Sequence, residues 1–201
     1  MQEKHDISVA NADVVSNRDV EMEKINTSLN KENLVVFEVE ADGHCLYRAL
    51  ADQINRSTDD SVHVFTQLQS HSQPQKNSID MGELRSIAAN EIQSHRESYA
   101  PFMGIFGDDA ESNAEFDGYV LKVKSVQAAE WGGQVEIKAL VCALHRDIWI
   151  YSSDLSNPII KMNITEDSNG SSSSSSIPPL KVSYHRQYYA LGEHYNSVIP
   201  I

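Results

Sequence analysis

The chain contains only two cysteines, Cys45 and Cys142, among its 201 residues. Two thiols are too few for a disulfide framework, and without neighbouring pairs of histidines they make a poor zinc site. Cys142 lies in the apolar run at residues 139–144, where a small thiol is typical of core packing. We therefore expect neither a structural disulfide nor a zinc site.

Long hydrophobic runs and an excess of positive charge are also absent. No stretch of about 18 apolar residues occurs, and the N-terminal residues lack the apolar core of a signal peptide. Sixteen basic residues against 29 acidic ones give a net charge of -13, so a phosphate backbone would be repelled. We expect a cytoplasmic protein, with the nucleus as the second compartment that the sequence allows, and neither a membrane nor nucleic acid as its partner.

Composition divides the chain into a polar N-terminal part and one globular domain. Residues 1–33 are mostly charged or amide-bearing and show no clear hydrophobic face, which predicts a flexible tail or a fragment of a longer helix. Residues 34–201 have the size of a single domain. Within it, residues 168–179 contain a run of serines followed by Ile-Pro-Pro, which predicts a flexible loop.

The pattern of apolar residues changes from helical to strand-like along this domain. Three- and four-residue spacings predict helices starting at about Cys45 and at residues 81–99, 114–126 and 133–145. Short runs rich in β-branched and aromatic residues predict strands at residues 34–39, 147–151, 158–162, 180–184 and 195–200. Helices followed by strands predict an α+β fold, with a small central β-sheet packed between helices.

Cys45 is the residue with the clearest chemistry. It follows a strand and the turn Asp42-Gly43-His44 and opens a helix, so its thiol lies at the positive end of a helix dipole. This position favours a thiolate at neutral pH. Gly43 permits close approach of a substrate carbonyl, and amides of the turn, including that of His44, are expected to form an oxyanion hole.

A histidine near the other end of the chain provides a base for this thiol. Side chains alternate along a strand, so His194 and Asn196 face the same side of the strand predicted there. Asn196 can then orient the imidazole while the other ring nitrogen faces Cys45. Asp42 is the second candidate for this role, although its carboxylate can equally brace the cysteine turn, and we favour bracing.

Three separated segments resemble the OTU (ovarian tumour) family of deubiquitinases, nearest the OTU-domain-6 type. Residues 41–50, ADGHCLYRAL, are similar to the cysteine box of the family, and residues 192–198, GEHYNSV, to its histidine box. Residues 130–140, EWGGQVEIKAL, resemble its third recurrent block. The resemblance covers residues 34–201 as an OTU-like catalytic domain, and it implies the fold of a papain-like cysteine protease.

The resemblance also implies an activity and the roles of residues. The enzyme would be a thiol-dependent hydrolase that cleaves the isopeptide bond between the ubiquitin C-terminal glycine and a lysine, without a metal or other cofactor. Cys45 would be the nucleophile, His194 the general base and later acid, and Asn196 or Asp42 the orienting residue. Ubiquitin and ubiquitinated proteins would be the partners, and we expect a monomer.

Several alternatives remain open at this point. Tyr195 is expected to flank the cleft, while Trp131 either contacts the ubiquitin tail or anchors the core. A catalytically weak or silent ubiquitin-binding module with the same fold is the main rival function, but every position of the triad is filled by a competent residue. A general papain-like peptidase is disfavoured, because no tryptophan follows Cys45.

Overall fold

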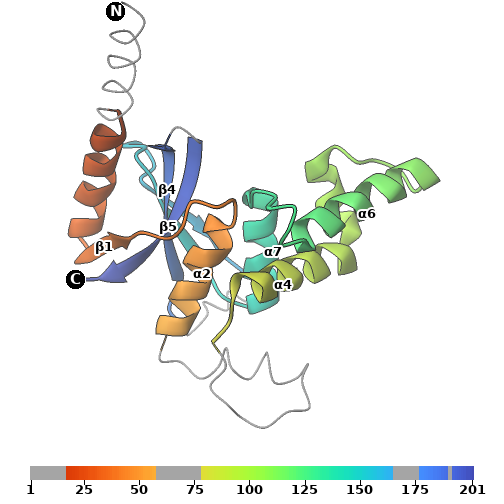
Figure 1. The fold of residues 1–201 in the computed structure, drawn as a ribbon, viewed down its shortest axis with the longest axis horizontal. Coiled ribbons are helices and arrows are strands. Elements are labelled where there is room, and N and C mark those ends of the chain that lie inside the picture. The colour runs from red at the N-terminus through yellow and green to blue at the C-terminus, as the bar shows by residue number, and fades with distance from the viewer. Residues whose placement is uncertain (1–16, 58–77, 165–176, 190–191) are drawn as a thin grey trace, which may run out of the picture.

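The computed structural model describes residues 17–57, 78–164, 177–189 and 192–201, and this part of the chain folds around one five-stranded sheet (Figure 1). The strands are β1 (Leu34–Phe37), β2 (Ile148–Tyr151), β3 (Ile159–Met162), β4 (Leu180–Tyr189) and β5 (Gly192–Pro200). Their order is β1-β5-β4-β2-β3, in which β2 and β4 run parallel and the other neighbours antiparallel. Strand β5, which contains the histidine motif, therefore lies inside the sheet.

Helices cover both faces of this sheet. The larger layer consists of α2 (Cys45–Arg56), α4 (Met81–Ser94), α5 (Arg96–Tyr99), the 3-10 helix η1 (Ala100–Met103), α6 (Ala110–Lys124) and α7 (Gln134–Leu144). Leu50, Leu84 and Leu140 from this layer share one buried core with Ile150 and Val182 of the sheet. The predicted α+β fold with a sheet between helices is thus confirmed. None of the helices in the described segments is long and apolar enough to cross a membrane.

The second face of the sheet is covered by a helix at residues 17–30, red in Figure 1. Its buried positions lie four residues apart on one side of the helix: Glu21, Ile25 and Leu29. The two apolar residues pack against Tyr151 and Val198, which belong to a cluster separate from the main core. Of the two alternatives predicted for residues 1–33, a flexible tail or a fragment of a longer helix, residues 17–30 agree with the helix, and residues 1–16 lie outside the described part.

The other predicted elements are confirmed with shifted ends. The helix predicted for residues 81–99 is interrupted at His95, which separates α4 from α5. Helix α6 begins at Ala110 rather than Ala114, because the side chain of Asp109 accepts hydrogen bonds from the amides of its first turn. The predicted serine-rich loop lies outside the described residues, except for its last three positions.

Candidate active site

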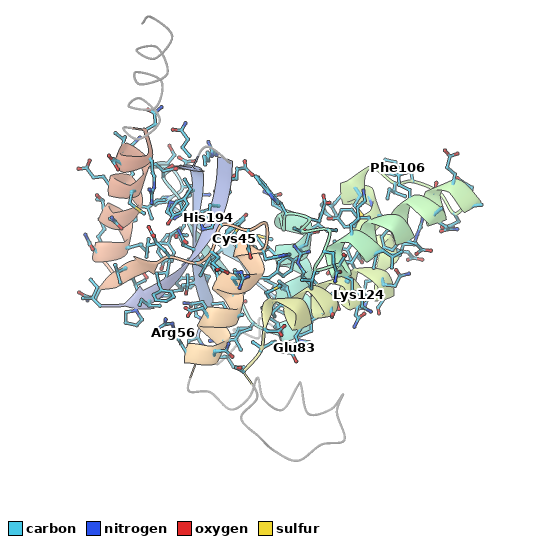
Figure 2. All side chains as sticks on the ribbon, in the orientation of Figure 1. Cys45, Arg56, Glu83, Phe106, Lys124 and His194 are labelled. Carbon is cyan, nitrogen blue, oxygen red and sulfur yellow. The ribbon has the colours of Figure 1, made fainter. Side chains whose placement is uncertain are left out.

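The cysteine turn connects β1 to α2 and places Cys45 at the first residue of α2, where Figure 2 shows it near His194. Gly43 has a left-handed conformation with φ of 81°, and a methyl group on its Cα would lie 2.8 Å from the carbonyl oxygen of Ala129. Only glycine fits there without strain or collision. The Asp42 carboxylate accepts a hydrogen bond from the backbone amide of His44 at 3.1 Å, which closes the turn.

A buried arginine that the sequence analysis did not predict forms hydrogen bonds with this turn. Arg85 of α4 is fully buried and donates to Nδ1 of His44 at 3.0 Å and to the carbonyl oxygen of Gly43 at 3.3 Å. It also donates to the carbonyl oxygens of Val123 at 2.8 Å and Glu130 at 2.5 Å. One guanidinium therefore joins the cysteine turn, the end of α6 and the segment that leads into α7.

The Cys45 sulfur lies between helix α2 and strand β5. The amide of Tyr195 donates to Sγ at 3.5 Å, and the amides of Leu46 and of Cys45 itself also act to lower the pKa of the thiol. Burial raises the pKa of the thiol, and although these three amides act to lower it, the pKa of Cys45 stays above its ordinary value. Burial therefore acts against the thiolate at neutral pH that the start of the helix is predicted to favour.

The imidazole of His194 is oriented by Asn196. Its Nε2 lies 3.0 Å from Oδ1 of Asn196, and both side chains are buried on the same side of β5. That oxygen also accepts a hydrogen bond from the amide of Val39 at 2.9 Å, which identifies it as the amide oxygen. An amide oxygen only accepts, so Nε2 carries the proton and Nδ1 is the basic nitrogen. Burial lowers the pKa of His194, against the opposing effect of its hydrogen bonds.

Asp42 makes its contacts within the turn and with α2. Arg48 donates from Nε to the Asp42 carboxylate at 2.9 Å, in addition to the amide of His44. Burial acts to raise the pKa of Asp42, but the hydrogen bonds and the charge of Arg48 outweigh it and hold the pKa below its usual value. These contacts brace the turn, whereas the contact with His194 comes from Asn196.

Two residues predicted at the oxyanion hole and the cleft act through atoms other than those expected. The amide of His44 was predicted to bind a substrate oxygen, but it donates to Asp42 and is not available for that role. Burial together with the charge of Arg85 lowers the pKa of the His44 imidazole. Tyr195 meets the sulfur through its backbone, while its ring packs against Tyr184 with centroids 5.0 Å apart. The amides at the first turn of α2 are therefore the better candidates for the oxyanion hole.

Trp131 lies at the rim of the site. The residue is 55% exposed, and its ring lies 3.9 Å from the position that a methyl group on Gly192 would occupy, two residues before His194. The next residue, Gly132, lies directly against α2, where a methyl group would be 2.5 Å from Cδ2 of Leu46. Trp131 is thus an exposed rim residue and not an anchor of the core.

The assembled groups suit nucleophilic attack on a carbonyl. A thiol, an imidazole with a basic Nδ1 and several backbone amides converge where α2 meets β5. Within the described residues, no group of three or more His, Cys, Asp or Glu side chains is placed to hold a metal ion.

Alkylation of Cys45 is expected to accelerate with pH to beyond 9.0. A raised thiol pKa means that the thiolate is lost as pH falls below that raised value, and a lowered pKa leaves His194 neutral above 6.5. In Cys142→Ser protein, the second-order rate constant with iodoacetamide should rise about tenfold per pH unit. A plateau between about pH 5 and pH 8 would instead indicate a preformed thiolate–imidazolium pair.

Comparison with known families and sequences gives one consistent result. A family model described as OTU-like cysteine protease matches residues 40–195. The deubiquitinase OTUD6B of Homo sapiens is 34% identical over 182 residues, covering 90% of this chain and 52% of the relative. OTU domain-containing protein 2 of Saccharomyces cerevisiae is 29% identical, covering 89% of this chain and 50% of the relative. The chain thus spans about half the length of these curated relatives.

Solved structures show the same fold. The OTU domain of OTUD1 superposes with a TM-score of 0.61 at 21% identity, covering 92% of this chain and 98% of that one. An OTU deubiquitinase from Wolbachia pipientis gives a TM-score of 0.52 at 11% identity, covering 84% of this chain and 89% of that one. At these identities the likeness establishes the arrangement of helices and strands.

Proposed function

Because the chain belongs to the family of OTU-like cysteine proteases, we propose that it is a deubiquitinase. It would hydrolyse the isopeptide bond between the C-terminal glycine of ubiquitin and a lysine of a substrate or of another ubiquitin. The proposal rests on one observation: the Cys45 sulfur accepts a hydrogen bond from the amide of Tyr195. This residue lies between His194 and Asn196, whose side chain orients the imidazole. The human relative named a deubiquitinase supports the same function.

His194 acts first as a general base and then as a general acid. Its Nδ1 takes the proton of Cys45 while Sγ attacks the carbonyl carbon of the ubiquitin glycine. The tetrahedral oxyanion then collapses, the C–N bond breaks, and the lysine amine leaves with the proton from Nδ1. A thioester between Cys45 and ubiquitin remains. Water gives one proton to His194 as its oxygen attacks the thioester. The C–S bond then breaks, that proton returns to Sγ, and ubiquitin leaves as a carboxylic acid that loses the second proton of water to the solvent.

Proton transfer is expected to accompany the attack. Burial raises the pKa of Cys45 and lowers that of His194, which favours a neutral thiol and a neutral imidazole before the attack. The imidazolium that forms during attack keeps its Nε2 proton on Asn196. The oxyanion develops beside the amides of Cys45 and Leu46, at the positive end of α2.

The rim of the site suits a tail that ends in two glycines. Gly192 and the exposed ring of Trp131 lie side by side at the approach to His194. A chain of glycines requires only a narrow passage, and Trp131 offers a flat apolar surface beside it. The net charge of -13 favours the approach of a tail that contains arginines.

The same proposal includes a cytoplasmic monomer that acts on ubiquitinated proteins. Both cysteines are free thiols, as is usual in a reducing compartment. Light scattering of the purified chain should give the mass of a single copy, and a dimer mass would contradict the monomer.

A ubiquitin probe with a C-terminal electrophile tests the function directly. We expect one covalent adduct, located on Cys45 by peptide mass spectrometry, because an electrophile in place of the glycine carbonyl meets Sγ. The matched control is Cys142→Ala, which should be labelled as well as the natural chain. An adduct on Cys142 would contradict the assignment. Binding of ubiquitin with neither adduct nor cleavage would indicate the silent ubiquitin-binding module.

A further inference from the structure

A tyrosine from the neighbouring strand stacks on the face of the His194 imidazole. Tyr188 lies in β4, and its ring centroid is 4.4 Å from that of His194, with the two planes inclined by only 16°. Tyr188 is fully buried. The guanidinium carbon of Arg18, from the helix at residues 17–30, lies 4.5 Å from the centre of the same tyrosine ring. Tyr188 therefore connects this helix to the histidine.

The backbone that presents Tyr188 is fixed by a carboxylate of the same helix. Strand β4 departs from regular pairing with β5 in this region, and the amides of Arg186 and Gln187 donate to Glu21 at 2.9 Å and 3.0 Å. Glu21 is buried and also accepts a hydrogen bond from Ser153 at 3.2 Å. A buried carboxylate that satisfies two amides of an irregular strand holds that strand in one conformation.

We propose that the helix at residues 17–30 is part of the catalytic apparatus, with Tyr188 as a positioning residue for His194 and Glu21 as the anchor of Tyr188. The proposal rests on the proposed function, because it takes His194 as the base. The helix and the histidine lie on the same side of the sheet. His194 and Val198 are four residues apart on β5, so their side chains point to the same face, and Val198 packs against the helix.

A face contact complements the hydrogen bonds of the imidazole. These bonds, with Asn196 and with the backbone of Val39, hold the ring through its nitrogens, whereas a stacked ring restrains its face. Stacking on Tyr188 limits tilting of the ring and so holds Nδ1 in the one direction that the proposed proton transfer with Cys45 requires. The face of a tyrosine ring also stabilises the imidazolium that forms during attack. Both effects act on turnover and not on ubiquitin binding.

Kinetics of four variants of the chain test the stack. Tyr188→Leu should lower kcat for ubiquitin cleavage by about tenfold to a hundredfold, with KM changed by less than about twofold. Tyr188→Phe keeps the aromatic face and should recover most of kcat. Glu21→Gln should lower kcat several-fold, whereas Glu23→Gln, an exposed position on the same helix, is the matched control and should not. Equal losses in Tyr188→Phe and Tyr188→Leu would overturn the proposal.

A spectroscopic readout separates this proposal from the proposed function. In the natural chain, the ring protons of His194 should be shifted upfield by the current of the stacked tyrosine. The shift should disappear in Tyr188→Leu and persist in Tyr188→Phe. This measurement needs no activity, so a missing adduct with the ubiquitin probe would overturn the function alone. An unchanged His194 spectrum and unchanged kcat in Tyr188→Leu would overturn the positioning role alone.

Discussion

Cys45→Ala is expected to abolish cleavage of ubiquitin substrates, and His194→Ala to lower kcat by about a thousandfold at neutral pH. The thiol has a pKa above its ordinary value, so almost none of it is thiolate at neutral pH without a base. His194 is the group placed to take this proton, since its Nε2 is committed to Asn196 and its Nδ1 is basic. Initial rates with a fluorogenic ubiquitin substrate would measure both losses.

The residual activity of His194→Ala should have a distinctive pH dependence. Without the imidazole, the rate should follow the thiolate fraction, and it should therefore keep rising as pH passes 9.0, toward the raised pKa of Cys45. The natural chain should instead lose activity only as pH falls through the lowered pKa of His194, below 6.5. Residual activity that does not change with pH would argue against a direct proton transfer between the two residues.

His185 offers a matched control on the neighbouring strand. It is cross-strand from His194, equally buried, and its Nε2 lies 2.9 Å from the hydroxyl of Ser183. Burial, followed by the charge of His194, lowers its pKa to about 4, so it stays neutral throughout the working range. His185→Ala should lower kcat by less than about tenfold, as expected for a packing change. A loss equal to that of His194→Ala would contradict the assignment of His194 as the one base of the two.

Local patterns were sufficient to predict the elements that meet at the site. The start of α2 at Cys45 follows from a glycine turn before a helical periodicity, and the pairing of His194 with Asn196 follows from the alternation of side chains along a strand. Each of these relations involves residues within a few positions of one another. They are therefore readable without knowledge of the tertiary fold.

Features that depend on distant partners could not be read in this way. The helix at residues 17–30 has a buried stripe whose first member is Glu21, and a charged residue there conceals the periodicity. Its carboxylate is buried only because irregular amides of β4 meet it. The raised pKa of Cys45 has a similar origin, since its largest cause is burial, which is a property of the whole fold.

Arg85 is a further residue whose role depends on distant partners, and we expect its replacement to lower stability more than any other change proposed here. It shares a helix face with Ala89 and Ile92, both fully buried, which is the one sequence signal of its burial. Arg85→Met should lower the free energy of unfolding by about 4 kcal/mol, because three carbonyl oxygens and the Nδ1 of His44 lose their donor in a buried setting. Urea denaturation would measure this loss.

Arg48→Met is the matched control for this prediction. Arg48 pairs with Glu40 at 3.0 Å and with Asp42 at 2.5 Å, but its side chain is 33% exposed, and such ion pairs contribute less than about 1 kcal/mol. Arg85→Lys should fall between the two, since an ammonium group reaches only some of the four acceptors. Equal midpoints for Arg85→Met and Arg48→Met would contradict a central role of Arg85.

Arg85→Met should also lower activity beyond its effect on stability. Two acceptors of Arg85 lie in the turn before Cys45, and a third belongs to Glu130, directly before Trp131. Protein that remains folded at low temperature should therefore have a misplaced thiol, and its kcat should fall by more than the unfolded fraction accounts for. If activity fell only in proportion to unfolding, the turn would be held by Gly43 and Asp42 alone, and Arg85 would serve the core and not the site.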